Sequence, residues 1–472
     1  MSRLHVSTFV VMQPFKINVI GAGMAGSETA WMLARHGFKV HLFEMKPKQF
    51  SPAHKLEGFA ELVCSNSLGS MMEYSAPQLL KEEMTSLGSL ILEGAMYGQV
   101  PAGKALGVDR EKLSEYVTKK ISSHPNIEIV REEFTKINPE EITVIATGPL
   151  TSDALSQELA RYIGADTLYF YDSISPIIDA DSIDYSKTFF GSRYEEEQDD
   201  YLNCPLSKDQ YFQFVKDILE AEKVPVRSFE EMKCFEACMP VEVLVERGPK
   251  TLMFGPMKPV GLFNPHEGRR PYAVVQLRRE NMPTTMYNMV GFQTRMKWGD
   301  QKRVFQTIPG LEKCEFISMG SMHRNTYIDA PRLLAKDLFL KEHSNIALAG
   351  QLTGVEGYVE SAAMGMMVGL AIIQRAKKIE WKQPPLDSAL GALMNYITTP
   401  KEKGKFSPMN INFGLLPPFE TERRMEKKEK KEAMVHRARS SFNTWKSGLS
   451  FFTSTENTFN DTAKNAQPDS RV

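Results

Sequence analysis

A glycine-rich turn between two apolar segments near the start of the chain constrains the fold more than any other feature. Residues 16–20 (KINVI) predict a short buried strand, and GAGMAG follows it directly. Residues 27–37 carry helical apolar spacing and end at Gly37, a suitable C-cap. The next segment, KVHLFE, predicts a second strand that ends at Glu44. The sequence therefore predicts a βαβ unit of the dinucleotide-binding type.

The glycines of this turn each have a physical role in binding a dinucleotide. The first permits a tight turn, the second lets the backbone approach a pyrophosphate, and the third lets the helix pack closely on the strand. The helix N-terminus would offer N–H donors to the phosphates. Glu44, 18 residues after the last glycine, would accept hydrogen bonds from the adenosine ribose. The predicted cofactor-binding residues here are Gly21, Ala22, Gly23, Met24, Ala25, Gly26 and Glu44.

Two later segments also predict a buried strand that is followed directly by glycine. Residues 141–150 (EITVIATGPL) predict a strand that ends in Ala-Thr-Gly, and residues 344–370 predict a strand, a glycine-rich turn and a helix rich in Gly and Ala. Small residues there would let the backbone approach a large flat cofactor. These segments add Thr147, Gly148, Gly350, Gln351, Gly354, Gly357 and Tyr358 to the predicted cofactor-binding residues. A dinucleotide domain that closes only near residue 380 is typical of FAD enzymes, whereas NAD dehydrogenases usually keep that domain contiguous.

The predicted fold class is α/β, with a Rossmann-like FAD-binding domain that is interrupted by a smaller α+β insertion domain. A Pro-marked linker and a charged helical pattern follow the second half of the FAD-binding domain. The predicted parts are a leader (1–15), the FAD-binding domain (16–180 and 310–385), the insertion domain (181–309), a C-terminal helical region (386–453) and a disordered tail (454–472).

The composition favours a soluble protein of the cytoplasm. Five cysteines in 472 residues are too few and too scattered for a disulfide framework. The longest apolar run, residues 362–373, is well short of the roughly 20 residues that span a bilayer. Residues 1–15 lack an apolar core followed by a small-residue cleavage site, so we do not expect a signal peptide.

The charges are unevenly distributed although the net charge is only −1. Residues 248–303 contain ten Lys or Arg residues against three acidic ones, and they are interleaved with aromatic residues such as Tyr272 and Trp298. Basic groups neutralise phosphates and aromatic rings stack on unpaired bases, so this segment is a candidate RNA surface. The alternative is a solvated basic face that the acidic residues 194–201 balance.

The segment KCFEACMPVE places Cys234 and Cys238 four residues apart, on one face if it is helical. The two thiols could form a redox pair, half of a metal site, a catalytic thiol with a bystander, or two small core residues. A zinc site is disfavoured because no second Cys/His cluster stands at ligand spacing, and no metal is expected.

Eight motifs, taken in order, resemble the folate- and FAD-dependent tRNA (uracil-5-)-methyltransferases, a family of GidA-like flavoproteins. The motifs are GAGMAGSETAW, CSNSLGS, ATGPLTSD, CFEACMPVE, PYAVVQLRREN, YNMVGFQTRMKWGDQKRVF, MHRNTYI and GQLTGVEGYVESAAMG, and they lie within residues 16–439. The resemblance implies methylation of C5 of the T-loop uridine of tRNA, which forms ribothymidine. It also implies 5,10-methylenetetrahydrofolate as the one-carbon donor, FAD reduced by NAD(P)H, the tRNA T-arm as partner, and no membrane or obligatory protein partner.

The resemblance also implies two catalytic thiols, because uracil C5 becomes nucleophilic only after a thiolate adds at C6. Matched by motif, they are Cys64 in CSNSLGS as nucleophile and Cys238 in FEACMPVE as general base, and the reverse order stays open. Cys204 and Cys314 stand in no such motif and are expected to be structural. Asp109 and Arg110 in GVDREKL are expected to be structural or to lie near FAD. Candidate contacts to folate or RNA are His323, Arg278, Arg279, Arg295 and Lys297.

Four other functions compete with this interpretation. The same chemistry could act on a uridine of 23S ribosomal RNA. A related flavoenzyme family modifies the wobble uridine of tRNA, although CSNSLGS and GFQTRMKWG point away from it. A flavin-dependent thiol-disulfide oxidoreductase could use Cys234 and Cys238, but a second glycine fingerprint for NAD(P)H is missing. A non-enzymatic FAD-bound RNA-binding protein is the last alternative.

Overall fold

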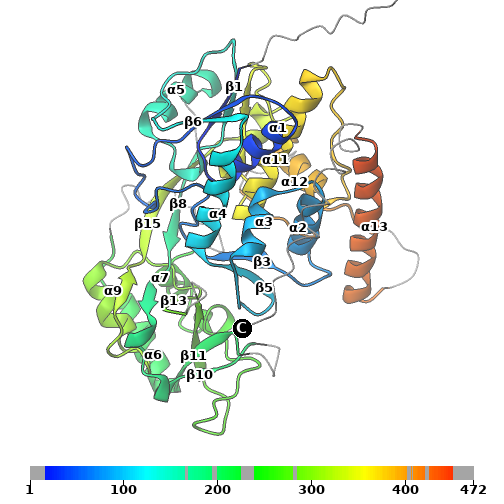
Figure 1. Cartoon of the computed structure of the whole chain (residues 1–472). Coiled ribbons are helices and arrows are strands. Elements are labelled where there is room, and N and C mark those ends of the chain that lie inside the picture. Colours follow the sequence, from blue (N-terminus) through cyan, green and yellow to red (C-terminus); the bar gives the residue numbers. More distant parts are fainter. Residues whose placement is uncertain are drawn as a thin grey trace, which may run out of the picture.

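A five-stranded parallel sheet lies at the centre of the larger part of the molecule (Figure 1). The computed structural model describes residues 16–164, 168–193, 199–224, 239–279, 284–400, 406, 408–419 and 425–449. In spatial order the strands are β16 (Ile346–Leu348), β7 (Ile142–Ile145), β1 (Ile17–Ile20), β2 (Val40–Phe43) and β6 (Ile127–Val130). Every neighbouring pair is parallel. The sheet thus combines strands from the first 150 residues with one from about 200 residues later, and the predicted Rossmann-like α/β fold is confirmed.

Two helices cross each other closely beside this sheet (Figure 1). They are α1 (Met24–Arg35), which follows β1, and α11 (Tyr358–Ala376), which follows β16. A Cβ atom built on Gly365 of α11 would lie 2.1 Å from the Ala25 carbonyl oxygen of α1. Only glycine at this position lets the two backbones approach so closely, and so α11 brings residues 350–361 beside the glycine-rich turn.

Further helices complete the larger part of the molecule, and two buried carboxylates cap two of them. The helices are α2 (Ala76–Ser86), α3 (Leu90–Tyr97), α4 (Arg110–Ser123), α5 (Asp153–Ile163), α10 (Ala330–Leu333), α12 (Ala389–Thr398) and α13 (Lys427–Ser447). Of these helices, and among the residues that the structure describes, α13 packs on α2 and not on the sheet. Glu28 accepts hydrogen bonds from the main-chain N–H groups of Leu90 and Ile91 at the start of α3. Glu83 accepts from those of Ala389 and Leu390 at the start of α12. Both carboxylates thus satisfy donors that a helix N-terminus leaves unpaired.

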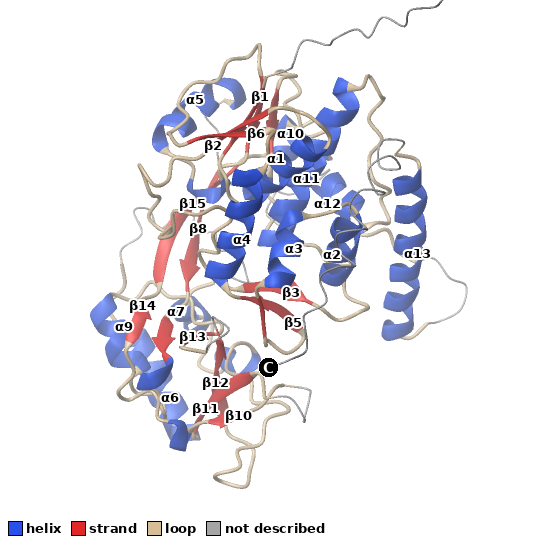
Figure 2. Cartoon of the chain, in the orientation of Figure 1, coloured by secondary structure: helices blue, strands red, loops and turns tan. Residues whose placement is uncertain are grey.

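A second, six-stranded antiparallel sheet forms the smaller part of the molecule (Figure 2). Its strands are, in spatial order, β10 (Phe189–Phe190), β11 (Tyr201–Leu206), β12 (Ala273–Arg279), β13 (Met286–Met289), β9 (Ile177–Asp179) and β14 (Phe316–Ser318). Its helices are α6 (Lys208–Glu220), α7 (Val241–Glu246), α8 (Thr251–Phe254) and α9 (Trp298–Phe305). This part has its own hydrophobic core, separate from that of the parallel sheet. The exact domain limits stay predictions.

Two small sheets lie between these parts (Figure 2). The antiparallel pair β8 (Leu168–Ile174) and β15 (Ser321–Tyr327) carries the chain into the six-stranded sheet and back. The second is a three-stranded sheet of β3 (Ser67–Ser70), β5 (Ala105–Val108) and β4 (Gln99–Val100). Because β3 forms the second half of the CSNSLGS motif, pairing with β5 fixes the position of the backbone that follows Cys64.

The predicted leader, the predicted tail and the residues 225–238 lie outside the described part of the chain. Among the helices that the structure describes, none combines the length and the apolar character that a membrane span needs.

The close crossing of α1 and α11 makes Gly365 intolerant of a side chain. We expect Gly365→Ala to lower the free energy of unfolding by about 1–3 kcal/mol, because the added methyl group meets main-chain atoms that cannot rotate away. Gly369→Ala, one turn later, is the control, since its Cβ would meet the Met32 side chain at 3.0 Å and main-chain atoms only at 3.5 Å, an ordinary van der Waals distance. Urea unfolding of both variants measures the effect, and equal losses would contradict the prediction.

The Glu83 cap makes stability depend on pH. Burial raises the pKa of Glu83 from 4.5 to about 8, so the folded chain binds this proton more tightly than the unfolded chain does. The stability contributed by Glu83 is therefore full below pH 4.5 and is lost as the pH rises towards about 8. We expect the difference in unfolding free energy between wild type and Glu83→Gln to fall across this range, by up to about 1.4 kcal/mol per pH unit. A difference that does not vary with pH in urea titrations would refute this.

Candidate active site

Two adjoining cavities lie at the carboxyl ends of β1, β7 and β16, where nucleotides bind in open parallel sheets. The larger has a volume of about 420 Å³ and the smaller of about 80 Å³. Their shared walls are Gly23, His54, Glu61, Ala146, Thr147 and Leu150. A ligand of two joined halves, such as a dinucleotide, fits this arrangement.

The glycine-rich turn forms one wall of both cavities. Gly21 has a φ of +93°, and a Cβ atom on it would lie 2.9 Å from the Ala146 carbonyl oxygen. A Cβ atom on Gly26 would lie 1.7 Å from the Gly21 carbonyl oxygen. A Cβ atom on Gly23 would meet nothing within 4 Å, and Gly23 begins α1 without a side-chain cap. The backbone around Gly23 therefore leaves room for a pyrophosphate at the N-terminus of α1.

Glu44 lies buried in the wall of the smaller cavity. Its carboxylate accepts hydrogen bonds from the main-chain N–H groups of Ala22 and Lys46, both at 3.0 Å. The Lys46 ammonium in turn lies 3.3 Å from the Glu61 carboxylate, and both side chains of that ion pair are buried. The predicted ribose acceptor thus also fixes the end of β2 against the glycine-rich turn.

The segment before α11 forms a second wall of the larger cavity, next to the glycine-rich turn. Gly350, Gln351, Gly357 and Tyr358 line it, as the sequence predicted for a cofactor wall. Gly350 has a φ of +78° and Gly357 a φ of +117°, so neither position favours a side chain. Gly354 faces Phe406 instead, at 2.4 Å from an added Cβ atom to the ring. Packing against Phe406 therefore explains why residue 354 is a glycine. Gly354 was predicted to bind the cofactor, but it does not line the cavity.

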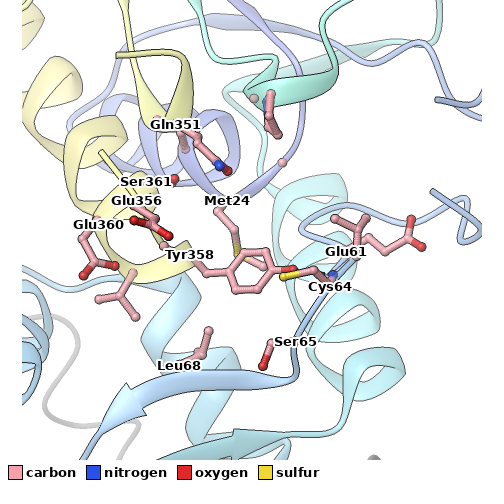
Figure 3. A pocket seen from close by; sticks show the side chains of 18 of the residues that line it. Met24, Glu61, Cys64, Ser65, Leu68, Gln351, Glu356, Tyr358, Glu360 and Ser361 are labelled. Atoms are coloured by element: carbon pink, nitrogen blue, oxygen red, sulfur yellow. Dashed lines mark hydrogen bonds between the residues drawn. The ribbon is translucent and has the colours of Figure 1, made fainter. Parts of the chain in front are cut away.

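Cys64 lies in the wall of the larger cavity, across from α11 (Figure 3). Its main-chain N–H donates to the Tyr358 hydroxyl oxygen at 2.8 Å, and its carbonyl oxygen accepts from Arg110 Nη2 at 3.0 Å. Figure 3 shows the Tyr358 ring reaching across the cavity to the cysteine side chain. Burial, together with the neighbouring thiol, raises the pKa of Tyr358 well above 10, so its hydroxyl stays neutral beside Cys64.

Three further residues lie in or beside the site, and of these the sequence analysis named only Arg110, as structural or near FAD. Arg110 binds the Leu62 and Cys64 carbonyl oxygens, while its neighbour Asp109 caps α4. Asn66, within CSNSLGS, is fully buried beside Cys64. Gln293, within GFQTRMKWG, lines the larger cavity. Asn66 and Gln293 stand in motifs that were recognised, but the motifs alone do not show that Gln293 lines the cavity and that Asn66 is buried.

The second predicted catalytic thiol, Cys238, lies outside the described residues, as does Cys234. The chain resumes close to the site, because the main-chain N–H of Val241 donates to the Gln293 carbonyl oxygen at 2.7 Å. His323 belongs to β15, opposite Asp172 of β8, and its side chain also lies outside the described part. The pairing of Cys64 with Cys238 and the role of His323 therefore stay predictions.

The four basic residues that were predicted to contact folate or RNA differ in how exposed they are. Arg278 and Arg295 are each only 6% exposed, and Arg295 lies 4.0 Å from the Glu246 carboxylate. Lys297 is exposed and pairs with Glu222 at 2.6 Å. Arg279 is half-buried at the end of β12. Two of the four are therefore interior residues of this structure and do not add to a basic surface.

Comparisons with known proteins agree on the family and on the fold. Residues 16–380 match the family described as glucose inhibited division protein A. A methylenetetrahydrofolate–tRNA-(uracil-5-)-methyltransferase TrmFO from Aquifex aeolicus is 52% identical over 91% of this chain and 96% of its own length. The enzyme of the same name from Geobacter sp. is 52% identical over 92% and 99%. A crystal structure of Aquifex aeolicus GidA is similar in fold at 17% identity, with a TM-score of 0.65 over 92% of this chain and 74% of that one.

Because the space beside Gly23 is open, a side chain added there should weaken FAD binding without destabilising the fold. We expect Gly23→Ala to lower FAD affinity about tenfold or more, because its methyl group enters the space for the pyrophosphate, whereas unfolding of the cofactor-free protein is unchanged. Gly299→Ala is the control, since its Cβ also meets nothing within 4 Å but lies on α9. The flavin absorbance of the purified variants measures the loss, and a normal flavin content of Gly23→Ala would refute the role of this turn.

Proposed function

This chain belongs to the methylenetetrahydrofolate–tRNA-(uracil-5-)-methyltransferases within the glucose inhibited division protein A family, and from that premise we propose that it methylates C5 of the T-loop uridine of tRNA. The one-carbon donor is 5,10-methylenetetrahydrofolate, and NAD(P)H reduces the FAD cofactor. The observation that carries the proposal is Cys64, a thiol in the wall of a cavity that the dinucleotide fingerprint also lines. The compartment that suits these substrates and the few cysteines is the cytoplasm.

FAD would be held by residues of both cavity walls. On one wall, Glu44 and the turn from Gly21 to Gly26 would hold the adenosine and pyrophosphate, with the N–H groups of α1 as donors. On the other, Gly350, Gln351, Gly357 and Tyr358 line the larger cavity together with Thr147 and Gly148. When bound, the reduced cofactor supplies the electrons that turn a folate methylene into a methyl group.

Cys64 would act as the nucleophile. Its thiolate adds to uracil C6, so that an S–C6 bond forms and the C5=C6 electrons move into the C4 carbonyl as an enolate. C5 of this enolate then attacks the electrophilic one-carbon unit. A base removes the C5 proton, and the electrons of that C–H bond form a C5=CH₂ double bond as the bond between the one-carbon unit and its carrier nitrogen breaks. A hydride, whose electrons reduced FAD would supply, then adds to this CH₂, and the electrons of C5=CH₂ re-form C5=C6 as the S–C6 bond breaks. The thiolate is regenerated, as a catalyst requires.

The general base of this cycle would be Cys238. Its support is indirect, because Val241, three residues later, is hydrogen-bonded to Gln293 in the wall of the cavity. Cys204 and Cys314 do not qualify. Both are buried in the core of the six-stranded sheet, and burial raises the pKa of each thiol, that of Cys314 to about 12.

The RNA partner would bind near the six-stranded sheet. Phe254 and Phe263 are 80% and 62% exposed, and Lys250, Arg269 and Arg270 are exposed in the same segment. Exposed rings can stack on unpaired bases of a loop, and the cations neutralise phosphates. A loop of tRNA therefore suits this surface, and the T-loop uridine is the target that we propose.

The nucleophile is tested by exchanging single cysteines. We expect Cys64→Ala to keep its FAD and to lose methylation of a tRNA transcript by roughly 10³-fold or more, because the variant lacks the thiol that we propose adds to C6. Cys204→Ala, in a remote core, is the matched control and should keep its activity. The assay follows transfer from methylenetetrahydrofolate, with S-adenosylmethionine and a 23S rRNA fragment in parallel. An active Cys64→Ala, use of S-adenosylmethionine, or methylation of the rRNA fragment alone would overturn the proposal.

A further inference from the structure

We propose that Arg278 is a positioning residue that holds the Cys64 loop across the boundary between the two parts of the molecule, and that it is not an RNA contact. The inference rests on the proposed function, since it concerns the same thiol. It assigns a role to a buried charge that the reaction itself does not use.

The Arg278 side chain binds the two residues that follow Cys64. Arg278 belongs to β12 of the six-stranded sheet and is 6% exposed. Its Nε donates to the Asn66 side-chain oxygen at 2.7 Å, and its Nη2 donates to the Ser65 hydroxyl at 3.0 Å. The planar guanidinium can direct donors at both acceptors at once, which fixes the direction of the loop as well as its distance.

Asn66 accepts a hydrogen bond from Arg278 and also donates one back to the same strand. It is fully buried, and its side-chain NH₂ donates to the Arg279 carbonyl oxygen at 2.9 Å. Its own carbonyl oxygen accepts from the Val108 N–H of β5 at 2.9 Å. The side-chain amide thus accepts from one residue of β12 and donates to the next, so the loop cannot slide along this strand without losing both hydrogen bonds.

The same loop is held on its other side by the FAD-binding part. Arg110 at the start of α4 binds the Cys64 carbonyl oxygen, and the Tyr358 hydroxyl at the start of α11 binds the Cys64 N–H. With both main-chain groups of Cys64 engaged, the direction of its Cα–Cβ bond is set. The thiol position therefore depends on two arginines, one from each part of the molecule.

Two further hydrogen bonds keep β12 in place relative to the loop. The Tyr201 hydroxyl of β11 donates to the Ala102 carbonyl oxygen at 2.9 Å, and the Gly103 N–H donates to the Asp200 carboxylate at 2.6 Å. β11 pairs with β12 along its length, so these contacts fix the strand that carries Arg278. A displacement of the six-stranded sheet would pull on the Cys64 loop through Asn66.

Positioning by Arg278 predicts a fall in turnover rather than in RNA affinity. Lysine keeps the charge but lacks the planar fork, so it cannot serve Asn66 and Ser65 together. We expect Arg278→Lys holoenzyme to keep its FAD absorbance and to change KM for a tRNA transcript by less than about threefold. Its kcat should fall about 10²-fold, the effect of a misplacement near 1 Å.

The reactivity of the Cys64 thiol is a readout that is independent of methylation. Iodoacetamide labelling of Cys64, followed by mass spectrometry over a range of pH, should show a shifted profile in Arg278→Lys. Arg247→Lys, an exposed arginine at the end of α7 that belongs to neither the site nor the proposed RNA surface, is the control and should match wild type in labelling and in kcat. Because labelling needs no substrate, it tests the positioning even if the wild-type protein methylates no tRNA, an outcome that would refute only the proposed function.

Ser65→Ala provides a second, milder variant if Arg278→Lys loses FAD or does not fold. It removes only the acceptor of the Nη2 hydrogen bond, so kcat should fall about tenfold with the same shift in labelling. Two results would overturn the proposal. One is a higher KM for tRNA with unchanged kcat and labelling, as expected for a phosphate contact, and the other is wild-type behaviour of the variants in every readout.

Discussion

The backbone contact between α1 and α11 is the constraint on which the rest of the structure depends. Gly365 leaves no room for a side chain against Ala25, and the Thr29 hydroxyl lies 2.8 Å from the Gly365 carbonyl oxygen. This contact brings residues 350–361 to the glycine-rich turn although they follow it by more than 300 residues. The larger cavity exists only because its two walls meet in this way, and the position across from α11 is where Cys64 lies.

The Cys64 loop links this cavity to the six-stranded sheet. Its hydrogen bonds to Tyr358 and Arg110 tie it to the FAD-binding part, and those of Asn66 tie it to β12. In the proposed function Cys64 is the reactive thiol, and these contacts connect its loop to both parts. A large substrate that binds the six-stranded sheet would then act on the position of the thiol through Asn66 and β12, without a longer path of coupled residues.

The sequence predicted those parts of the fold and site that local patterns determine. The βαβ unit from Ile17 to Phe43 and the cavity wall at Gly350 follow from apolar periodicity and from glycines in fixed places. The burial of Arg278 could not be predicted in this way, because its partner Asn66 is 212 residues away in the sequence. A count of local charges treats such an arginine like an exposed one, and so the predicted basic segment contained two interior residues.

The environments of the described thiols explain why one of them suits nucleophilic chemistry. Cys204 and Cys314 are surrounded by the core of the six-stranded sheet, where burial raises their pKa and disfavours the thiolate. Cys64 is instead half-buried in the cavity wall, with a neutral tyrosine hydroxyl as its neighbour. A hydroxyl that stays protonated can donate to a developing thiolate without adding a competing negative charge. Among these three thiols the amino acid is the same, so it is the location of Cys64 that favours it as the proposed nucleophile.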